Sequence, residues 1–351
     1  MPNTLSLHIS WKWSPLRGLK YLEILKPAAV NSRLKLAVWL DALAEMLELK
    51  ALILQWASPH APPFPFDVER TVTLPSLEHF NIMGHLEDCV LALAHLDLPV
   101  LTQLSLKAIR YLFPNSDDVR ELLPYVARYI YGTQHTQPWQ SMLIGNNDSY
   151  VDLHAWAVPD IGVEVHEFDP PTLPDATLAP CLALSFTCDD KTDSHYCNHL
   201  ALLCCLMPGL PLDSIMTLAA QDLCNRSRLG PHVSSRQFWL HISPKFSQLR
   251  RVRLSHSTVT GFIGMLLEGD TGRERSLLPS MTELILVDAV ASECDLWSLC
   301  DALMKRVEQG IPLEVLDLCM SFRSRHCSKY QAQLRRLSEI VVSESYEGTN
   351  T

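Results

Sequence analysis

The residues best suited to chemistry gather in one short stretch that is rich in cysteine, aspartate and histidine: Cys188, Asp193, His195, Cys197 and His199. Thiolate, imidazole and carboxylate groups are the ligands that zinc takes in proteins. His195 and His199 are spaced i, i+4, which would place both rings on one face of a helix. The stretch lacks the C-x-x-C and H-E-x-x-H spacings, so the sequence favours polar residues at the solvent-facing start of a helix and predicts no metal site.

A metal- or small-molecule-dependent enzyme with its site in residues 139–199 is the alternative that this stretch leaves open. Such an enzyme would need a deep pocket with converging polar groups near Trp139 and His195. Other catalytic patterns are missing from the sequence. Gly261-Phe-Ile-Gly264 lacks the lysine of a phosphate-binding loop, no G-x-S-x-G is present, and Asp117 and Asp118 would point apart on a regular element. The sequence therefore predicts no catalytic residue and no cofactor.

Composition indicates a folded protein with a large core. Of its 351 residues, 47% are hydrophobic and 19% charged, and the formal net charge is −10. An acidic chain is a poor match for nucleic acid or an anionic membrane surface. The sequence shows neither a secretory signal nor an apolar run of 18 residues, and its 11 cysteines follow no disulfide framework. We therefore expect a soluble, intracellular protein of the cytoplasm or nucleus.

The elements that would position any site come from a repeated pattern. Met281-Thr-Glu-Leu-Ile-Leu286 and Leu313-Glu-Val-Leu-Asp-Leu318 share the signature L-x-x-L-x-L with a first position that is Leu or Met, and a helical pattern at 296–307 lies between them. A short strand with one helix cannot bury its own apolar face. Each copy must therefore stack on a neighbour, and the sequence predicts a solenoid.

The other copies of the signature occur on both sides of a less regular middle region. They begin at Leu19, Leu49, Leu77, Leu101, Cys181 and Leu249. Within the runs that begin at Leu19 and Leu249, the copies start 24 to 32 residues apart, which overlaps and exceeds the leucine-rich-repeat period of about 20–29 residues. The predicted fold class is α/β: an irregular leucine-rich-repeat solenoid with a curved parallel sheet on the concave side and helices on the convex side. The expected organisation is one array over 1–340, with a hairpin and linker insertion at 139–180, a cap at 313–342 and a disordered tail at 343–351.

Two phrases within these copies carry a resemblance to a known family. They run from Ala37 to Leu54, including Val38-Trp-Leu-Asp41, and from Leu77 to Leu106, including Asp97-Leu-Pro-Val-Leu101. In repeat style they resemble the leucine-rich-repeat region of fungal F-box proteins. The resemblance implies the substrate-recognition part of an F-box-type ubiquitin ligase receptor. No F-box-like helix opens the sequence, so binding of the ligase adaptor is expected only if an F-box is present elsewhere.

The expected binding surface is the concave side of the sheet. In an L-x-x-L-x-L strand the leucines face the core and the alternating residues face the open side. Aromatic, charged and apolar side chains are mixed there, as on protein-binding surfaces. The residues predicted to contact a protein partner are Tyr21, Glu23, Ile53, Gln55, His79, Asn81, Gln103, Ser105, Arg251, Arg253, Glu283, Ile285, Val315 and Asp317.

Overall fold

The computed structural model describes residues 18–25, 36–56, 70–99, 102–110, 124–129, 138–146, 150–159, 180–188, 199–221, 235–255, 258–268, 277–287, 293–318, 327–341 and 343–345. The chain divides into two compact units, Met1–Ile109 (unit 1) and Arg110–Thr351 (unit 2). Each unit is mixed α/β, with strands that are mostly parallel in the described part. The single array expected over residues 1–340 stays a prediction.

The four main strands of unit 1 each begin within a signature copy. Its elements are β1 (Tyr21–Leu25), α1 (Leu36–Ala44), β2 (Ala51–Gln55), β3 (Val72–Thr73), β4 (His79–Gly84), α2 (Leu86–His95), β5 (Leu96–Asp97) and β6 (Gln103–Arg110). Strands β1, β2, β4 and β6 pair side by side in parallel, in that order. The short strands β3 and β5 form a separate parallel pair. The signature therefore predicts the position of all four main strands of this unit.

Leucine ladders form the core of unit 1. The register aligns Leu22, Leu52, Phe80 and Leu104 across the four strands. Each of these side chains is at most 6% exposed, and the ladder Ile24, Leu54, Ile82 and Leu106 runs parallel to it one pleat further on. Burial of one such side chain stabilises the fold by about 1.5–3 kcal/mol. The apolar face of each strand thus packs beside the apolar faces of its neighbours, as the repeat pattern predicts.

Unit 2 carries the longer series of strands and helices. Its elements are β7 (Ser141–Asn146), β8 (Tyr150–Trp156), β9 (Leu182–Cys188), α4 (His199–Leu206), β10 (Thr217–Gln221), α5 (Ser235–Ile242), β11 (Arg251–Ser255), α6 (Thr258–Glu268), β12 (Glu283–Val287), α7 (Glu293–Glu308), β13 (Val315–Asp317), α8 (Cys327–Ile340) and β14 (Ser343–Ser345), with short 3₁₀ turns at Met207–Gly209 and Ser243–Lys245. Residues 124–129 are also helical.

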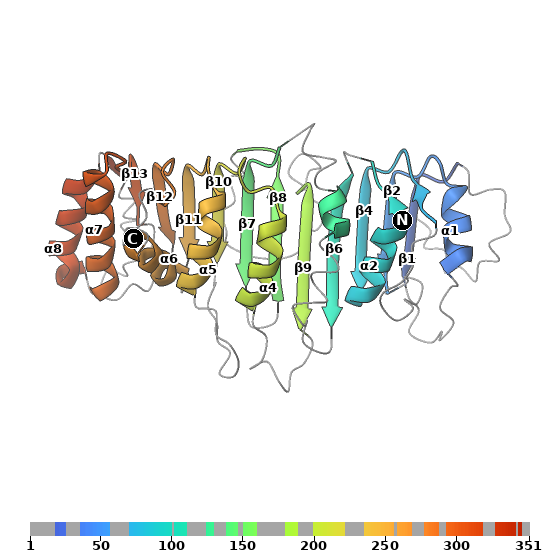
Figure 1. Ribbon diagram of the computed structural model, residues 1–351, viewed down its shortest axis with the longest axis horizontal. Helices are drawn as coiled ribbons and strands as arrows, with labels where there is room; N and C mark the ends of the chain where they lie inside the picture. Colours follow the sequence, from blue (N-terminus) through green and yellow to red (C-terminus); the bar gives the residue numbers. More distant parts are fainter. Residues whose placement is uncertain are drawn as a thin grey trace, which may run out of the picture. The chain divides into compact units, whose positions relative to one another are not determined.

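Strands β10 to β14 of unit 2 form a parallel series with the helices on one side. Leu218, Val252, Leu284 and Leu316 align across β10–β13, and each is at most 2% exposed. Helices α4 to α8 pack against one another in chain order, and Figure 1 shows α4 and α5 in front of the strands. The pairing of β12 with β13 confirms that the copies at 281–286 and 313–318 are neighbouring parallel strands.

The middle region departs from the order that the sequence predicts. Strands β7 and β8 form the expected antiparallel hairpin, but β7 also pairs in parallel with β10. Strand β9, which contains the copy at Cys181, pairs antiparallel with β8 and is not next to β10. The copy at Cys181 therefore does not stack directly on β10 in this series. The hairpin itself supplies the preceding strand, because β7 presents Met142 and Ile144 to the same core.

A main-chain contact recurs where each repeat begins. The carbonyl oxygen of Lys50 accepts hydrogen bonds from the amides of Glu78 and His79, at 2.8 and 2.9 Å. The carbonyl oxygens that accept two such bonds from the next strand belong to Lys20, Lys50, Gln140, Met216, Arg250 and Thr282. The position three residues after each clear copy holds no asparagine, so the sequence predicts no repeated hydrogen bond from asparagine side chains. The repeated contact is made by the backbone instead. Each of these strand entries is thereby fixed to the one before it.

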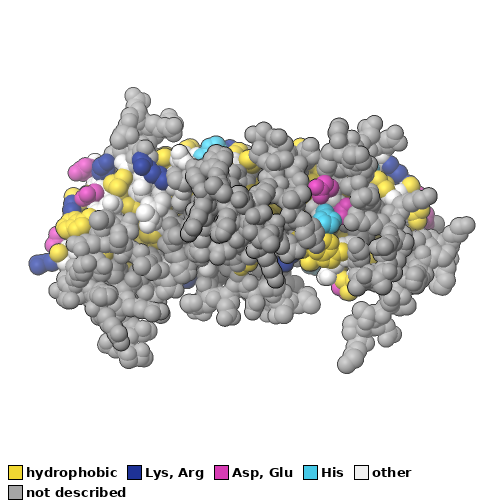
Figure 2. All heavy atoms as spheres, turned by 90° about the horizontal axis from the view of Figure 1, so that it is seen from below, with side chains coloured by type: hydrophobic (Ala, Val, Ile, Leu, Met, Phe, Trp, Pro, Cys, Tyr) yellow, Lys and Arg dark blue, Asp and Glu magenta, His cyan; other side chains and the backbone are white. Residues whose placement is uncertain are grey.

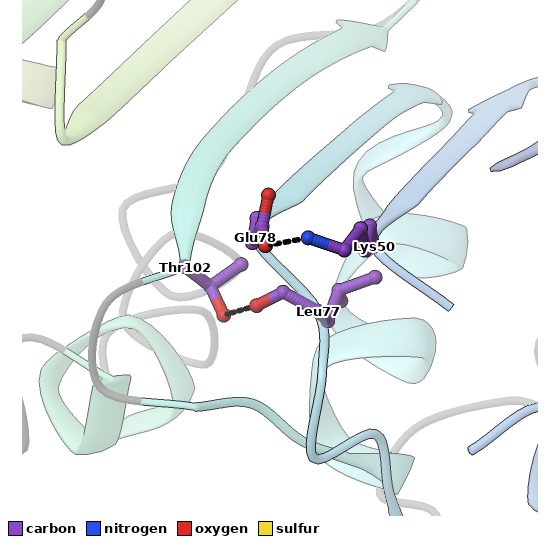
Figure 3. A network of polar contacts seen from close by, with 4 residues as sticks. All are labelled: Lys50, Leu77, Glu78 and Thr102. Atoms are coloured by element: carbon purple, nitrogen blue, oxygen red, sulfur yellow. Dashed lines mark hydrogen bonds and ion pairs between the residues drawn. The ribbon is translucent and has the colours of Figure 1, made fainter. Parts of the chain in front are cut away.

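The entry to β6 uses a side chain for this purpose. The Thr102 amide bonds to Pro99, and the Thr102 hydroxyl donates to the Leu77 carbonyl oxygen at 2.8 Å (Figure 3). Thr102 is 1% exposed. Close by, the side chain of Lys50 makes an ion pair with Glu78 on the solvent side (Figure 3). A buried hydroxyl thus replaces one of the two main-chain bonds found at the other entries.

The carboxy-terminal residues add one more strand. Ser343–Ser345, the first three residues of the expected disordered tail, form β14 and pair in parallel with β13. Residues 346–351 of the tail and residues 160–179 of the expected insertion lie outside the described residues. Within the described part of the chain, no helix combines the length and hydrophobicity needed to cross a membrane.

Candidate functional site

The predicted binding residues of unit 1 form rows across the open face of the sheet, the face whose side chains alternate with the buried ladders. The register aligns Tyr21, Ala51, His79 and Gln103 in one row. Glu23, Ile53, Asn81 and Ser105 form the second row, and Leu25, Gln55, Met83 and Lys107 form the third. All eight residues predicted for this unit are at least partly accessible, and Tyr21 is 53% exposed. The structure thus places all eight predicted residues of unit 1 on the open face of the sheet.

Unit 2 has an equivalent open face with more charge. Thr217, Arg251, Glu283 and Val315 align in one row, and Ala219, Arg253, Ile285 and Asp317 align in the next. All six predicted residues of this unit are partly accessible. Arg251 and Glu283, which are directly opposite each other, form an ion pair with a 2.5 Å separation between Nε and Oε2. The pair leaves this part of the face with both signs of charge.

Charged and apolar side chains are interspersed elsewhere too. Among the described residues that Figure 2 shows from below, basic and acidic groups lie among hydrophobic ones. Large exposed apolar residues include Tyr21 and Leu25, both on β1. Trp56, which follows β2, adopts a left-handed backbone with φ of 55°, and its ring lies edge-on to His85 at a centroid distance of 5.4 Å. Such mixed surfaces are typical of protein interfaces.

The open face becomes apolar and buried at β7, β8 and β10. Leu143, Trp156 and Ala219 form a cluster there in which each residue is at most 7% exposed. His154 is half-buried, and its ring lies 5.8 Å from the Trp156 ring. Burial lowers the pKa of His154 to about 4, so the imidazole is neutral at pH 7. A neutral imidazole donates a hydrogen bond from one ring nitrogen and accepts one at the other.

A row of residues at the carboxyl ends of β7, β10 and β11 was not predicted from the sequence. Gly145, Gln221 and Ser255 align across β7, β10 and β11. Gln221 Oε1 and Ser255 Oγ are inaccessible to solvent and have no hydrogen-bond partner in the described structure. No sequence signal identifies such a row, because it depends on the pairing of β7 with β10.

The residues considered for metal or catalytic chemistry lie mostly outside the described part of the chain. Cys188 ends β9 and His199 begins α4, whereas Asp193, His195 and Cys197 are not described. Trp139 is 1% exposed and belongs to the core. Among the described residues, no group of three or more histidine, cysteine or acidic side chains could hold a metal ion. The enzyme alternative at 139–199 stays a prediction.

Comparison with known proteins adds no relative to this description. A scan of the sequence against models of protein families gives no match, and a search among curated proteins gives none either.

Proposed function

We propose that this chain is a non-enzymatic protein-interaction module of the leucine-rich-repeat type, which presents the open face of its sheets to a protein partner. The observation that supports the proposal most is the alignment of the predicted residues into rows. Strands about 4.8 Å apart present side chains at regular intervals over a surface free of described helices. Regular, solvent-facing rows can contact a partner without rearrangement of the backbone.

The composition of the rows favours a protein partner. Unit 1 presents Tyr21, His79 and Asn81 with the apolar Ile53, and unit 2 presents Arg251 and Ile285. Tyrosine, arginine and methionine are enriched in protein interfaces, and mixed rows supply both apolar contact and hydrogen bonds. By the resemblance stated above, the partner would be a ubiquitylation target of an F-box-type ligase.

A capture experiment with matched variants tests the proposal. The full chain is compared with a face variant, Tyr21→Ser with Ile53→Ser, and with a control variant, Leu47→Ser. Leu47 is 57% exposed and lies outside the strands. Proteins captured after chemical cross-linking are identified by mass spectrometry, with and without added ligase adaptor. We expect a defined set to be lost at least about tenfold with the face variant alone, as removal of interface anchors predicts.

Two results of this comparison would contradict the proposal. The first is that the face variant, folded as judged by its thermal melting, captures the same proteins as the control. The second is that no protein is enriched over a blank matrix. Enrichment of the adaptor only when an F-box is fused to the chain would support the ligase assignment. Enrichment of targets without any adaptor would support the binding role alone.

A further inference from the structure

We draw no further inference here: the strongest candidate, the apolar cluster of Leu143, Trp156 and Ala219 on the open face of unit 2, carries none, because each of its residues is at most 7% exposed and nothing in the described part of the chain shows what covers them.

Discussion

Arg306 donates a hydrogen bond from Nη2 to the main-chain carbonyl oxygen of Met281, at 2.9 Å. The guanidinium also donates from Nη1 to the carbonyl oxygens of Leu277 and Leu278, at 3.1 and 3.2 Å. Arg306 is on α7, and the three carbonyls belong to the turn that leads into β12. Leu278 in this turn has a φ of 53°, which is costly for a branched residue. The arginine therefore holds a strained turn in place.

We expect Arg306→Met to lower the free energy of unfolding of unit 2 by about 2–4 kcal/mol, because three carbonyls lose a charged donor. Burial lowers the pKa of Arg306 to about 10, so the group is still charged at neutral pH. Urea unfolding followed by circular dichroism measures the loss. Arg335→Met is the control, because the guanidinium of Arg335 forms an exposed ion pair with Glu339. A loss below 0.5 kcal/mol is expected there, and equal effects of the two would contradict the role of Arg306.

Leu284 tests the ladder that holds unit 2 together. The residue is fully buried and aligns with Val252 and Leu316. Leu284→Ala should cost about 2–5 kcal/mol through lost burial and a cavity, and Leu284→Asp should prevent folding of the unit. The neighbouring Ile285, on the open face, should tolerate alanine with less than about 1 kcal/mol. Thermal melting of the Leu284 and Ile285 variants measures the difference. A Leu284→Asp chain that melts at the wild-type temperature would contradict the placement of Leu284 in the core.

Alanine substitutions at two glycines on α6 should have different effects on the stability of the protein. A Cβ at Gly261 would overlap the Ser235 side chain and lie 2.9 Å from the Ser235 backbone carbon, so α5 would have to move. At Gly264 the Cβ would lie 3.2 Å from Cδ of Arg236, a flexible side chain. We expect Gly261→Ala to cost about 1–3 kcal/mol and Gly264→Ala to be neutral or to stabilise by up to about 1 kcal/mol. Melting temperatures that fall equally in both would refute the close approach of α5 and α6.

Thr102→Val tests the side-chain contact at the entry to β6. Valine keeps the shape of threonine but leaves the Leu77 carbonyl oxygen without this donor, so we expect a loss of about 1–2 kcal/mol in unit 1. Thr73→Val is the control, because the Thr73 hydroxyl contacts Asp97 in an exposed setting. Chemical unfolding of the two variants should differ. An unchanged midpoint for Thr102→Val would show that the bond to Leu77 contributes nothing net.

His154 should make the stability of unit 2 depend on pH. Its pKa is lowered to about 4 by burial in the folded protein, against about 6.5 in an unfolded chain. The unfolded state therefore binds more protons between these values, and stability should fall as pH drops from 6.5 through 4. The slope contributed by one group is at most about 1.4 kcal/mol per pH unit. His154→Asn should flatten the dependence of the urea midpoint on pH, and an unchanged dependence would contradict the role of His154.

The sequence predicts the ladders well because each depends on a local pattern. Leu284 and Leu316 are recognisable in L-x-x-L-x-L copies, and the structure places them next to each other. The pairing of Ser141 with Thr217 was not predictable, because nothing near either residue specifies a partner so distant in the chain. The burial of Arg306 was equally hidden, since an arginine in the last turn of a helix is normally solvated. Local periodicity thus indicates which residues form strands, and non-local packing decides their order.

The shared carbonyls at the strand entries have a consequence for the order in which the protein can assemble. A strand whose first two amides attach to the preceding entry can form as soon as its predecessor is in place, so most of the ladder can grow by short steps along the chain. Strand β10 is the exception, because its amides attach to Gln140 and the intervening residues include two further strands and a helix. Growth of β11 to β14 must therefore wait for this one long loop to close.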